Sequence, residues 1–316
     1  QVSRRGFTRT GESVEKDAAG HGHRSLGSLY TRPDTKARHQ TLEPPSSAFG
    51  GVSCDELGRS RHECPILVVR GSLAFREIVD MIISLVQTKG GTGKSVLALN
   101  LAYAHELQKR FSDDSLIEFD PQGTLNSWWL QRQSESTEKL SVTYNHVSDT
   151  DLETLRNHLS TVTSPGTLAI IDTPGESTGR VHTKLACAVS DLVLIPMRAS
   201  TSDEAALAYH LLPIIQEILR HEPERQGRFQ VLPTFVNPRS HPDTVINYFR
   251  EILPDELGCL SAVLPSRSVY ENFNRDGMQL HEYAHSIRTN QRGLQAAQRA
   301  IADIDRIADA ILHHLS

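Results

Sequence analysis

The segment that most constrains this chain is the heptapeptide Lys89–Ser95, which reads KGGTGKS and lies between a short apolar run and a helical pattern. Glycines let the backbone curl so that successive N–H groups point inward and bind phosphate oxygens. The N-terminus of the helix that follows adds partial positive charge. Lys94 is placed to meet the β and γ phosphates of a nucleotide, and the Ser95 hydroxyl can ligate Mg²⁺. Because the glycines occur between a strand and a helix, the pattern predicts a phosphate-binding loop, here called the P-loop (Lys89–Ser95).

Apolar runs alternate with helical patterns from Met81 onward. The expected strands are Ile82–Gln87, Ser115–Phe119, Thr167–Ile171, Leu192–Pro196, Val231–Val236 and Ala262–Leu264. Helical patterns cover Ser95–Arg110, Asp203–Arg220 and Asp243–Leu253. Short apolar strands separated by helices are typical of a parallel sheet that is buried on both faces. We therefore expect residues 81–316 to form one α/β domain with a single doubly wound, mostly parallel sheet flanked by helices.

The last helical pattern, near Gly293 to Leu315, has an apolar stripe formed by Ile301, Ile304, Ala308, Ile311 and Leu315. Such a stripe fits either packing against the sheet or binding to a membrane surface. The polar side carries Asp303, Asp305 and Asp309, which anionic lipid would repel. We therefore expect this helix to pack against the sheet, and we expect no membrane partner.

Residues 1–80 differ in composition from the rest, being crowded with Arg, Gly, Ser, His and Pro and showing no sustained period of a strand or helix. Three interpretations are open: a disordered tail, a DNA-binding arm, or translated upstream DNA. We favour the third, with the native start at Met81, because Met81 opens the first expected strand. Peptides from before Met81 in the native protein would contradict it.

Composition excludes several classes of function. A formal net charge of −5 excludes a globally basic nucleic-acid binder, although a local basic patch remains possible. No apolar run reaches the roughly 18 residues that a membrane span requires. The four cysteines are Cys54, Cys64, Cys187 and Cys259, and none forms a CxxC pair. Neither a zinc site nor a redox dithiol is therefore indicated.

A lysine at the start of the P-loop is unusual, and Lys89 makes the segment resemble the deviant Walker A motif of the ParA/MinD superfamily of ATPases. The segment Asp120–Gly123 resembles the switch I of that family, and Leu168–Pro174 resembles its Walker B strand and switch II. Ser190–Pro196 resembles the strand that follows. The chain departs from the family pattern at Thr88, Val96 and Glu118.

The resemblance implies roles for particular residues, with ATP and Mg²⁺ as cofactors. Lys89 would reach across a homodimer interface to the partner's phosphates, Asp120 would position the attacking water, and Asp172 would hold Mg²⁺. The implied catalytic residues are Lys89, Lys94, Asp120 and Asp172. The implied Mg²⁺ ligands, partly through water, are Ser95, Asp120 and Asp172. The implied nucleotide contacts are Lys89, Gly90, Gly91, Thr92, Gly93, Lys94, Ser95 and Val96, with Asn237 and Pro238 beside adenine.

Within the superfamily, the chain is most similar to the small plasmid-partition and conjugal-transfer ATPases, through Asp120–Gly123, Trp128 and the segment Arg267–Leu280. That resemblance implies a slow, partner-stimulated ATPase that dimerises with ATP and binds DNA without sequence preference. It also implies a ParB-like or relaxosome partner and a cytoplasmic, nucleoid-associated location. The alternative is a metabolic ATP-dependent ligase or synthetase built on the same architecture.

DNA binding would need basic side chains that face phosphates. The candidates in the sequence are Arg239, Arg267, Arg275, Arg288 and Arg292, although any one of them could be ordinary surface charge. Trp128 and Trp129 are interpreted as packing residues, because large aromatic side chains are usually buried.

Overall fold

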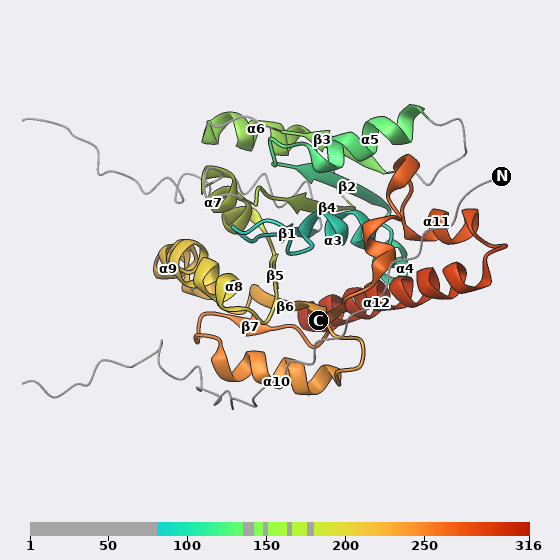
Figure 1. Cartoon of the computed structure of the whole chain (residues 1–316). Helices are drawn as coiled ribbons and strands as arrows, with labels where there is room; N and C mark the ends of the chain where they lie inside the picture. The colour runs from blue at the N-terminus through green and yellow to red at the C-terminus, as the bar shows by residue number, and fades with distance from the viewer. Residues whose placement is uncertain (1–80, 135–141, 148–150, 163–165, 176–179) are drawn as a thin grey trace, which may run out of the picture. The chain divides into compact units, whose positions relative to one another are not determined.

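The computed structural model describes residues 81–134, 142–147, 151–162, 166–175 and 180–316 (Figure 1). The expectations for residues 1–80, including those for Cys54 and Cys64, lie outside the described residues. In the described part of the chain, Cys187 is buried, Cys259 is half-buried, and both are free thiols.

An eight-stranded sheet forms the centre of the described part. Its order is β3-β2-β4-β1-β5-β6-β7, with β8 beside β6, and every pairing is parallel. The strands are β1 (Met81–Leu85), β2 (Asp113–Glu118), β3 (Thr143–His146), β4 (Thr167–Asp172), β5 (Leu192–Met197), β6 (Phe229–Val236), β7 (Gly258–Cys259) and β8 (Leu264–Pro265). The predicted fold class is confirmed. The sequence patterns missed β3 and β7, and they placed β8 too early, at Ala262–Leu264.

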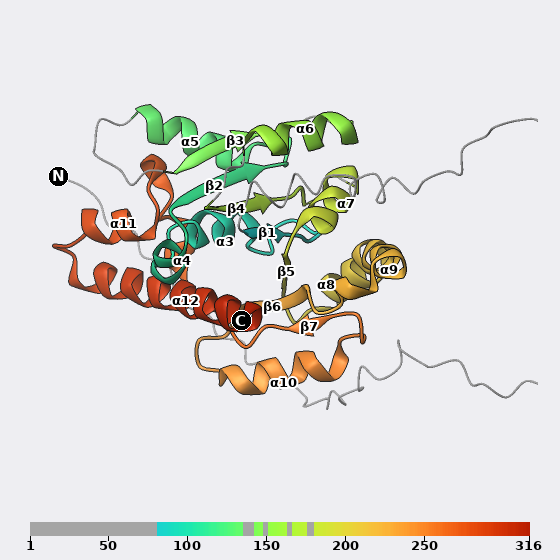
Figure 2. The same ribbon diagram turned by 180° about the vertical axis from the view of Figure 1, so that it is seen from behind.

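Helices cover both faces of the sheet. They are α3 (Lys94–Leu101), α4 (His105–Arg110), α5 (Thr124–Ser134), α6 (Leu152–Val162), α7 (Arg180–Val189), α8 (Thr201–Ala206), α9 (Leu212–His221), α10 (Pro242–Ile252), α11 (Leu280–Ser286) and α12 (Gln291–Leu315). Alternate residues of β1 point to opposite faces. Ile83 and Leu85 pack in a cluster with α3, α4 and α12, whereas Ile82 packs in a second cluster with α7 and α9. Figure 2 shows the same layers from behind.

The helix expected over Ser95–Arg110 is broken into α3 and α4, so that expectation was wrong as a continuous helix. Ala104 has an extended backbone, with φ −67° and ψ 127°. The Asn100 amide donates to the carbonyl of Val96 at 2.8 Å, while its Oδ1 accepts from Leu280 N at 3.2 Å. Because this asparagine bonds with the backbone of its own helix and with a distant segment, it favours a helix end rather than a helix interior.

The helix expected over Asp203–Arg220 contains a π-helical segment, η2 (Leu207–Leu211), between α8 and α9. Pro213 is the second residue of α9, and a proline ring within a helix clashes with the carbonyl four residues earlier. The wider π turn, in which Leu212 N donates to the carbonyl of Leu207, makes room for that ring. The chain therefore continues in the same direction into α9.

The expected packing of the last helix is confirmed, because α12 buries Ile304, Ile307 and Ile311 against the core. One part of the expectation was wrong. Asp303 is not on the solvent side but fully buried, where Arg267 and Arg306 pair with its carboxylate. None of the helices in the described part of the chain meets the length and apolarity that a bilayer-spanning segment requires.

Candidate functional site

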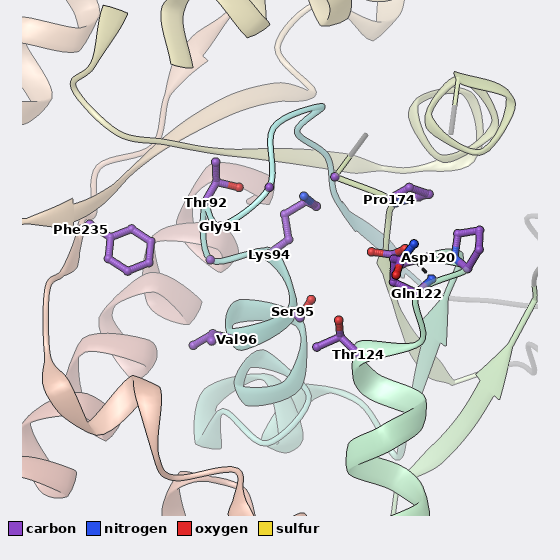
Figure 3. A pocket seen from close by; sticks show the side chains of 14 residues that line it. Gly91, Thr92, Lys94, Ser95, Val96, Asp120, Gln122, Thr124, Pro174 and Phe235 are labelled. Carbon is purple, nitrogen blue, oxygen red and sulfur yellow. Dashed lines mark hydrogen bonds between the residues drawn. The ribbon is translucent and has the colours of Figure 1, made fainter. Parts of the chain in front are cut away.

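The carboxyl ends of β1, β2 and β4 meet at one edge of the sheet, because these strands are neighbours and parallel. Asp172, the last residue of β4, pairs in register with Leu85 of β1 and Glu118 of β2. A cavity of about 500 Å³ lies at this edge. Residues 90–96, 120–122, 124, 174, 175 and 235 line it (Figure 3). A volume of this size suits a small-molecule ligand, and the edge is where open α/β sheets bind ligands.

The P-loop has the backbone shape that a phosphate site requires. Gly91 and Gly93 have φ of 70° and 99°, a region that side-chain-bearing residues rarely adopt. Gly93 is the N-cap of α3 and makes no side-chain cap, so the first-turn N–H groups face the cavity without a capping side chain. Gly175, after β4, comes so close that an added Cβ would lie 3.1 Å from the Cα of Gly90. The two loops therefore form one continuous wall.

Lys94 lies inside the loop rather than in solvent. Its Nζ donates to the carbonyl of Gln87 at 3.0 Å and to that of Lys89 at 3.4 Å. Burial lowers the pKa of Lys94, and the charges of Asp172 and Asp120 act in the opposite direction. An ammonium group held mainly by backbone carbonyls can exchange those bonds for stronger, charge-assisted bonds to phosphate oxygens.

Ser95 and Asp172 form the pair on which the metal expectation depends. Ser95 Oγ donates to Asp172 Oδ2 at 2.6 Å. Asp172 is fully buried, and its Oδ1 has no hydrogen-bond partner among the described residues. Burial raises the pKa of Asp172 to about 7, although Ser95 and Lys94 lower it. A buried carboxylate oxygen left without a donor, beside a hydroxyl, fits a site for a hard cation such as Mg²⁺.

Asp120 lies on the cavity wall just after β2 and is half-buried. Its Oδ1 accepts from Gln122 N at 2.9 Å, and its backbone carbonyl is 3.1 Å from His146 Nε2. The turn ends at Gly123, whose φ of 66° suits glycine. The structure thus places Asp120 and residues 90–95 of the P-loop on one cavity wall, and Asp172 is hydrogen-bonded to Ser95 of that wall. Lys89 does not line the cavity, and the chemical roles of all these residues stay predictions.

Glu118, a departure from the family pattern, has a structural explanation. Its buried carboxylate accepts from Leu125 N and Asn126 N, both at 2.8 Å, and from the Tyr144 hydroxyl at 2.7 Å. It therefore caps the first turn of α5, where unpaired N–H groups and the helix dipole favour an anion. The segment Asp120–Gly123 is consequently fixed at both ends, by β2 and by α5.

Lys89 is held within its own chain. Its Nζ donates to Ser202 Oγ at 2.6 Å and pairs with the buried Asp203 carboxylate. Asp203 also accepts from Arg198 N and from Ser200 Oγ, both at 2.9 Å. Burial raises the pKa of Asp203, but these hydrogen bonds, that of Lys89 first, lower it below its usual value. Sequence reasoning missed Asp203, although Ser200-x-x-Asp203 matches a helix-capping pattern that could have marked it.

The remaining sequence assignments concern two residues expected beside adenine and two tryptophans expected to be buried. Asn237 and Pro238 are exposed just after β6, where Asn237 Oδ1 accepts from Arg239 N at 3.0 Å. Neither lines the cavity, whereas Phe235, which the sequence did not single out, does. Their contact with adenine stays a prediction. Trp128 is buried and Trp129 packs against the same cluster, which confirms that both are packing residues.

The candidate DNA-contacting arginines divide into two groups. Arg267 is tied to the buried Asp303 carboxylate, so its guanidinium already has a structural partner and it is a poor candidate for binding phosphate. The exposed ones are Arg239, Arg275, Arg288 and Arg292. Arg288 lies in the connection between α11 and α12, and Arg292 lies in the first turn of α12.

Comparison with solved structures returns proteins of low sequence identity. A putative plasmid partition protein of Borrelia burgdorferi bound to AMPPNP is 18% identical, with 67% of this chain and 98% of that chain covered and a TM-score of 0.41. The MinD cell division protein of Aquifex aeolicus is 12% identical, with 74% and 97% covered and a TM-score of 0.46. Cobyrinic acid a,c-diamide synthase of Mycobacterium smegmatis, with an ATP analogue and magnesium, is 16% identical, with 74% and 95% covered and a TM-score of 0.45.

The family comparison is more decisive. A comparison with curated proteins finds no match. The CobQ/CobB/MinD/ParA nucleotide binding domain, in contrast, matches residues 83–280, which is more than half of the chain and includes the P-loop, Asp120 and Asp172. The resemblance inferred from the sequence motifs is thereby confirmed. The chain belongs to the CobQ/CobB/MinD/ParA family of nucleotide-binding domains.

Proposed function

We propose that this protein is an ATP-dependent switch ATPase that dimerises with ATP and acts in the partition or transfer of DNA. The observation that carries the proposal is that Lys94, Ser95 and Asp120 line one cavity, with Asp172 hydrogen-bonded to Ser95 beside it. A binding site for phosphate alone needs the loop and Lys94. The two carboxylates and Lys89 are the additional parts that hydrolysis and dimerisation would use.

ATP and Mg²⁺ are the proposed ligands. The P-loop N–H groups and Lys94 would bind the phosphates, and Ser95 with Asp172 would hold the cation, partly through water. When bound, Mg²⁺ would neutralise charge on the β and γ phosphates. The unpartnered Oδ1 of Asp172 supports this assignment, since it leaves an acceptor for a metal-bound water.

Asp120 is the proposed residue that orients the water for attack. It lies on the wall of the cavity and on a segment that Glu118 fixes through α5. In phosphoryl transfer the protein contributes mainly positioning and charge. A carboxylate on a fixed turn suits that task, because it can accept a proton of the water without moving far.

Lys89 is the proposed link between nucleotide and dimer. A cation supplied from the partner subunit would stabilise charge on the transferring phosphoryl group. To do so, Lys89 must leave Asp203 and Ser202 of its own chain. ATP-dependent dimerisation would then involve exchanging a contact within one chain for a contact between two, which suits a slow switch.

In the ATP state the dimer would bind DNA without sequence preference through exposed arginines such as Arg288 and Arg292. A ParB-like or relaxosome protein would then stimulate hydrolysis and release the DNA. Association with the nucleoid follows from such binding.

The test compares ATPase rate and DNA affinity of the full chain with ATP, with ADP and without nucleotide, at low salt and with nonspecific duplex DNA. We expect DNA binding only with ATP, with an affinity that falls steeply as salt rises. No DNA binding with ATP at low salt would overturn the DNA function.

Since the family also includes CobQ and CobB, a ligase or synthetase remains the second candidate. ATP turnover that ignores DNA but depends on a small-molecule co-substrate would favour it.

A further inference from the structure

The end of β6 contains a shift in strand register that no sequence motif predicts. Thr234 pairs with Leu264 and Val236 pairs with Pro265, so Phe235 is the extra residue of a β-bulge between β6 and β8. Its φ of 53° lies in the left-handed region, where a bulky aromatic residue is rarely found. Bulges commonly redirect a side chain beside a functional site, and backbone strain of this kind persists only where the surrounding structure enforces it.

The bulge directs the Phe235 ring to the nucleotide cavity rather than into the core. The residue is 38% exposed, unlike Phe229 of the same strand, which is fully buried. Its ring forms part of the cavity wall, and Cε2 lies 3.4 Å from the position that a Cβ on Gly93 would occupy. A ring in contact with the start of α3 is therefore left partly open to solvent at the edge of the P-loop.

A planar, charged group already lies over this ring. The Arg198 guanidinium lies 4.1 Å from the ring centroid, and its Nη2 donates to the carbonyl of Gly91. Its Nε, although buried, has no hydrogen-bond partner among the described residues. The space over Phe235 thus accepts a flat, delocalised group, and the group that now occupies it is incompletely bonded.

The cavity has two chemically different ends, which fixes the direction of a bound nucleotide. Figure 3 shows Lys94 between Phe235 on one side and Asp120 with Pro174 on the other. The terminal phosphate belongs at the end with Asp120 and the Ser95–Asp172 pair. The remainder of the nucleotide must then extend from Lys94 toward Phe235.

We propose that Phe235 stacks against the base of the bound nucleotide, in the place that the Arg198 guanidinium occupies in this structure. The inference rests on the proposed ATP binding and adds the residue that recognises the nucleoside portion. Stacking on an aromatic face is favourable for any base. Phe235 therefore provides affinity for a nucleoside triphosphate over inorganic polyphosphate, without selecting adenine over guanine.

The test measures binding of Mg-ATP and of Mg-tripolyphosphate to the full chain by titration calorimetry. Phe235→Ala should weaken ATP binding about tenfold or more and leave tripolyphosphate binding within about twofold of wild type. Phe235→Trp should restore ATP affinity, whereas Phe235→Leu should not, because it returns bulk without a stacking face. Leu130→Ala is the matched control, since Leu130 is another exposed apolar residue, on α5, and does not line the cavity.

Two results would overturn the inference while leaving the proposed binding of ATP to the wild-type chain intact. One is a Phe235→Ala variant that binds ATP as wild type does. The other is a variant that loses ATP and tripolyphosphate affinity equally, which would make Phe235 a support for the P-loop. A wild-type chain that binds tripolyphosphate but not ATP would instead contradict the proposed function, and this inference with it.

Discussion

The two ends of the nucleotide cavity are built in different ways. At the carboxylate end, Asp172 is the last residue of β4 and Asp120 lies two residues after β2, and the parallel register of β2, β4 and β1 brings these strand ends beside the P-loop. At the aromatic end, Phe235 reaches the cavity through a β-bulge and a left-handed backbone, and Arg198, from the loop before α8, lies over its ring. The carboxylate end is suited to acting on phosphate, and the aromatic end to recognising what carries the phosphate.

Because the two ends differ, substitutions at one end should affect ATP affinity and substitutions at the other should affect the rate of hydrolysis. A change at the carboxylate end should alter hydrolysis more than binding, because charge and positioning matter most in the transition state. A change at the aromatic end should alter binding more than hydrolysis. A change at Lys94, which lies between the ends, should remove both.

The largest effect is therefore expected for Lys94→Ala. The variant loses the buried cation that would meet the phosphates, and we expect ATP binding to fall below detection, at least about 100-fold weaker. Fluorescent-nucleotide titration measures this, with circular dichroism to show that the variant is folded. ATP affinity near that of wild type would remove Lys94 from the phosphate site.

Asp120→Ala should separate ATP binding from ATP hydrolysis most clearly. The variant keeps the P-loop and the Ser95–Asp172 pair, so ATP should still bind and the dimer should still form. Hydrolysis should fall about 100-fold or more, because the water loses its orienting carboxylate. Phosphate release under saturating ATP is the measurement, and Gln122→Ala, on the same turn, is the control. Normal turnover in Asp120→Ala would exclude a catalytic role for that carboxylate.

The same contrast explains what could be predicted from the sequence. The P-loop, Asp120 and Asp172 were predictable because each follows a short apolar run directly, so local sequence fixes its place at the sheet edge. Phe235 was not, since a bulge depends on pairing between β6 and β8. The contact of Lys89 with Asp203 joins residues 114 positions apart, and no local pattern reports such a pair.

In the fold, too, features set by local sequence were predictable and features set by distant contacts were not. The order of strands and helices was predictable from apolar periodicity, because a sheet buried on both faces requires continuous apolar strands. The break after α3 depends on Asn100, whose side chain bonds with Leu280. The short strand β3 was missed because its residues are half-buried or exposed at the sheet edge, so it carries no apolar run.

A smaller effect is expected when Lys89 is released from its own chain. Asp203→Asn keeps an acceptor for Arg198 N but removes the charge that holds Lys89. We expect the ATP-dependent dimer to form at a protein concentration a few-fold lower, because Lys89, the partly exposed partner of this buried carboxylate, no longer has to leave a charged group. Sedimentation velocity with ATP measures the shift. Ser202→Ala removes one neutral hydrogen-bond partner of Lys89, so it should lower the concentration needed for dimerisation by less. An unchanged or weaker dimer in Asp203→Asn would mean that the contact does not compete with dimerisation.

The last effect is on stability rather than on ATP binding or turnover, and it concerns a carboxyl group at the opposite edge of the sheet from the cavity. Asp114, near the start of β2, has an Oδ1 without a hydrogen-bond partner among the described residues. Burial raises its pKa from 3.8 to about 7, while a hydrogen bond from Gln108 lowers it. Between these two pH values the folded state holds a proton that the unfolded state has lost, so stability falls as pH rises.

Asp114→Asn removes this dependence, since an amide does not titrate. From about pH 4 to about pH 7 the free energy of unfolding of wild type should therefore fall relative to that of the variant. Above pH 7 the difference between the two should stay constant to pH 8. Urea unfolding at several pH values measures this, and the value at pH 4, where the folded wild type is still protonated at Asp114, provides the reference. A difference that does not change with pH would show that Asp114 ionises in the folded protein as it does in the unfolded chain. Asp114 and Asp172 both have a raised pKa and an oxygen without a hydrogen-bond partner among the described residues. If Asp114 ionises normally, the raised pKa would distinguish Asp172, at the nucleotide cavity, from Asp114, which is far from it, and that would support Asp172 as a ligand-binding carboxylate.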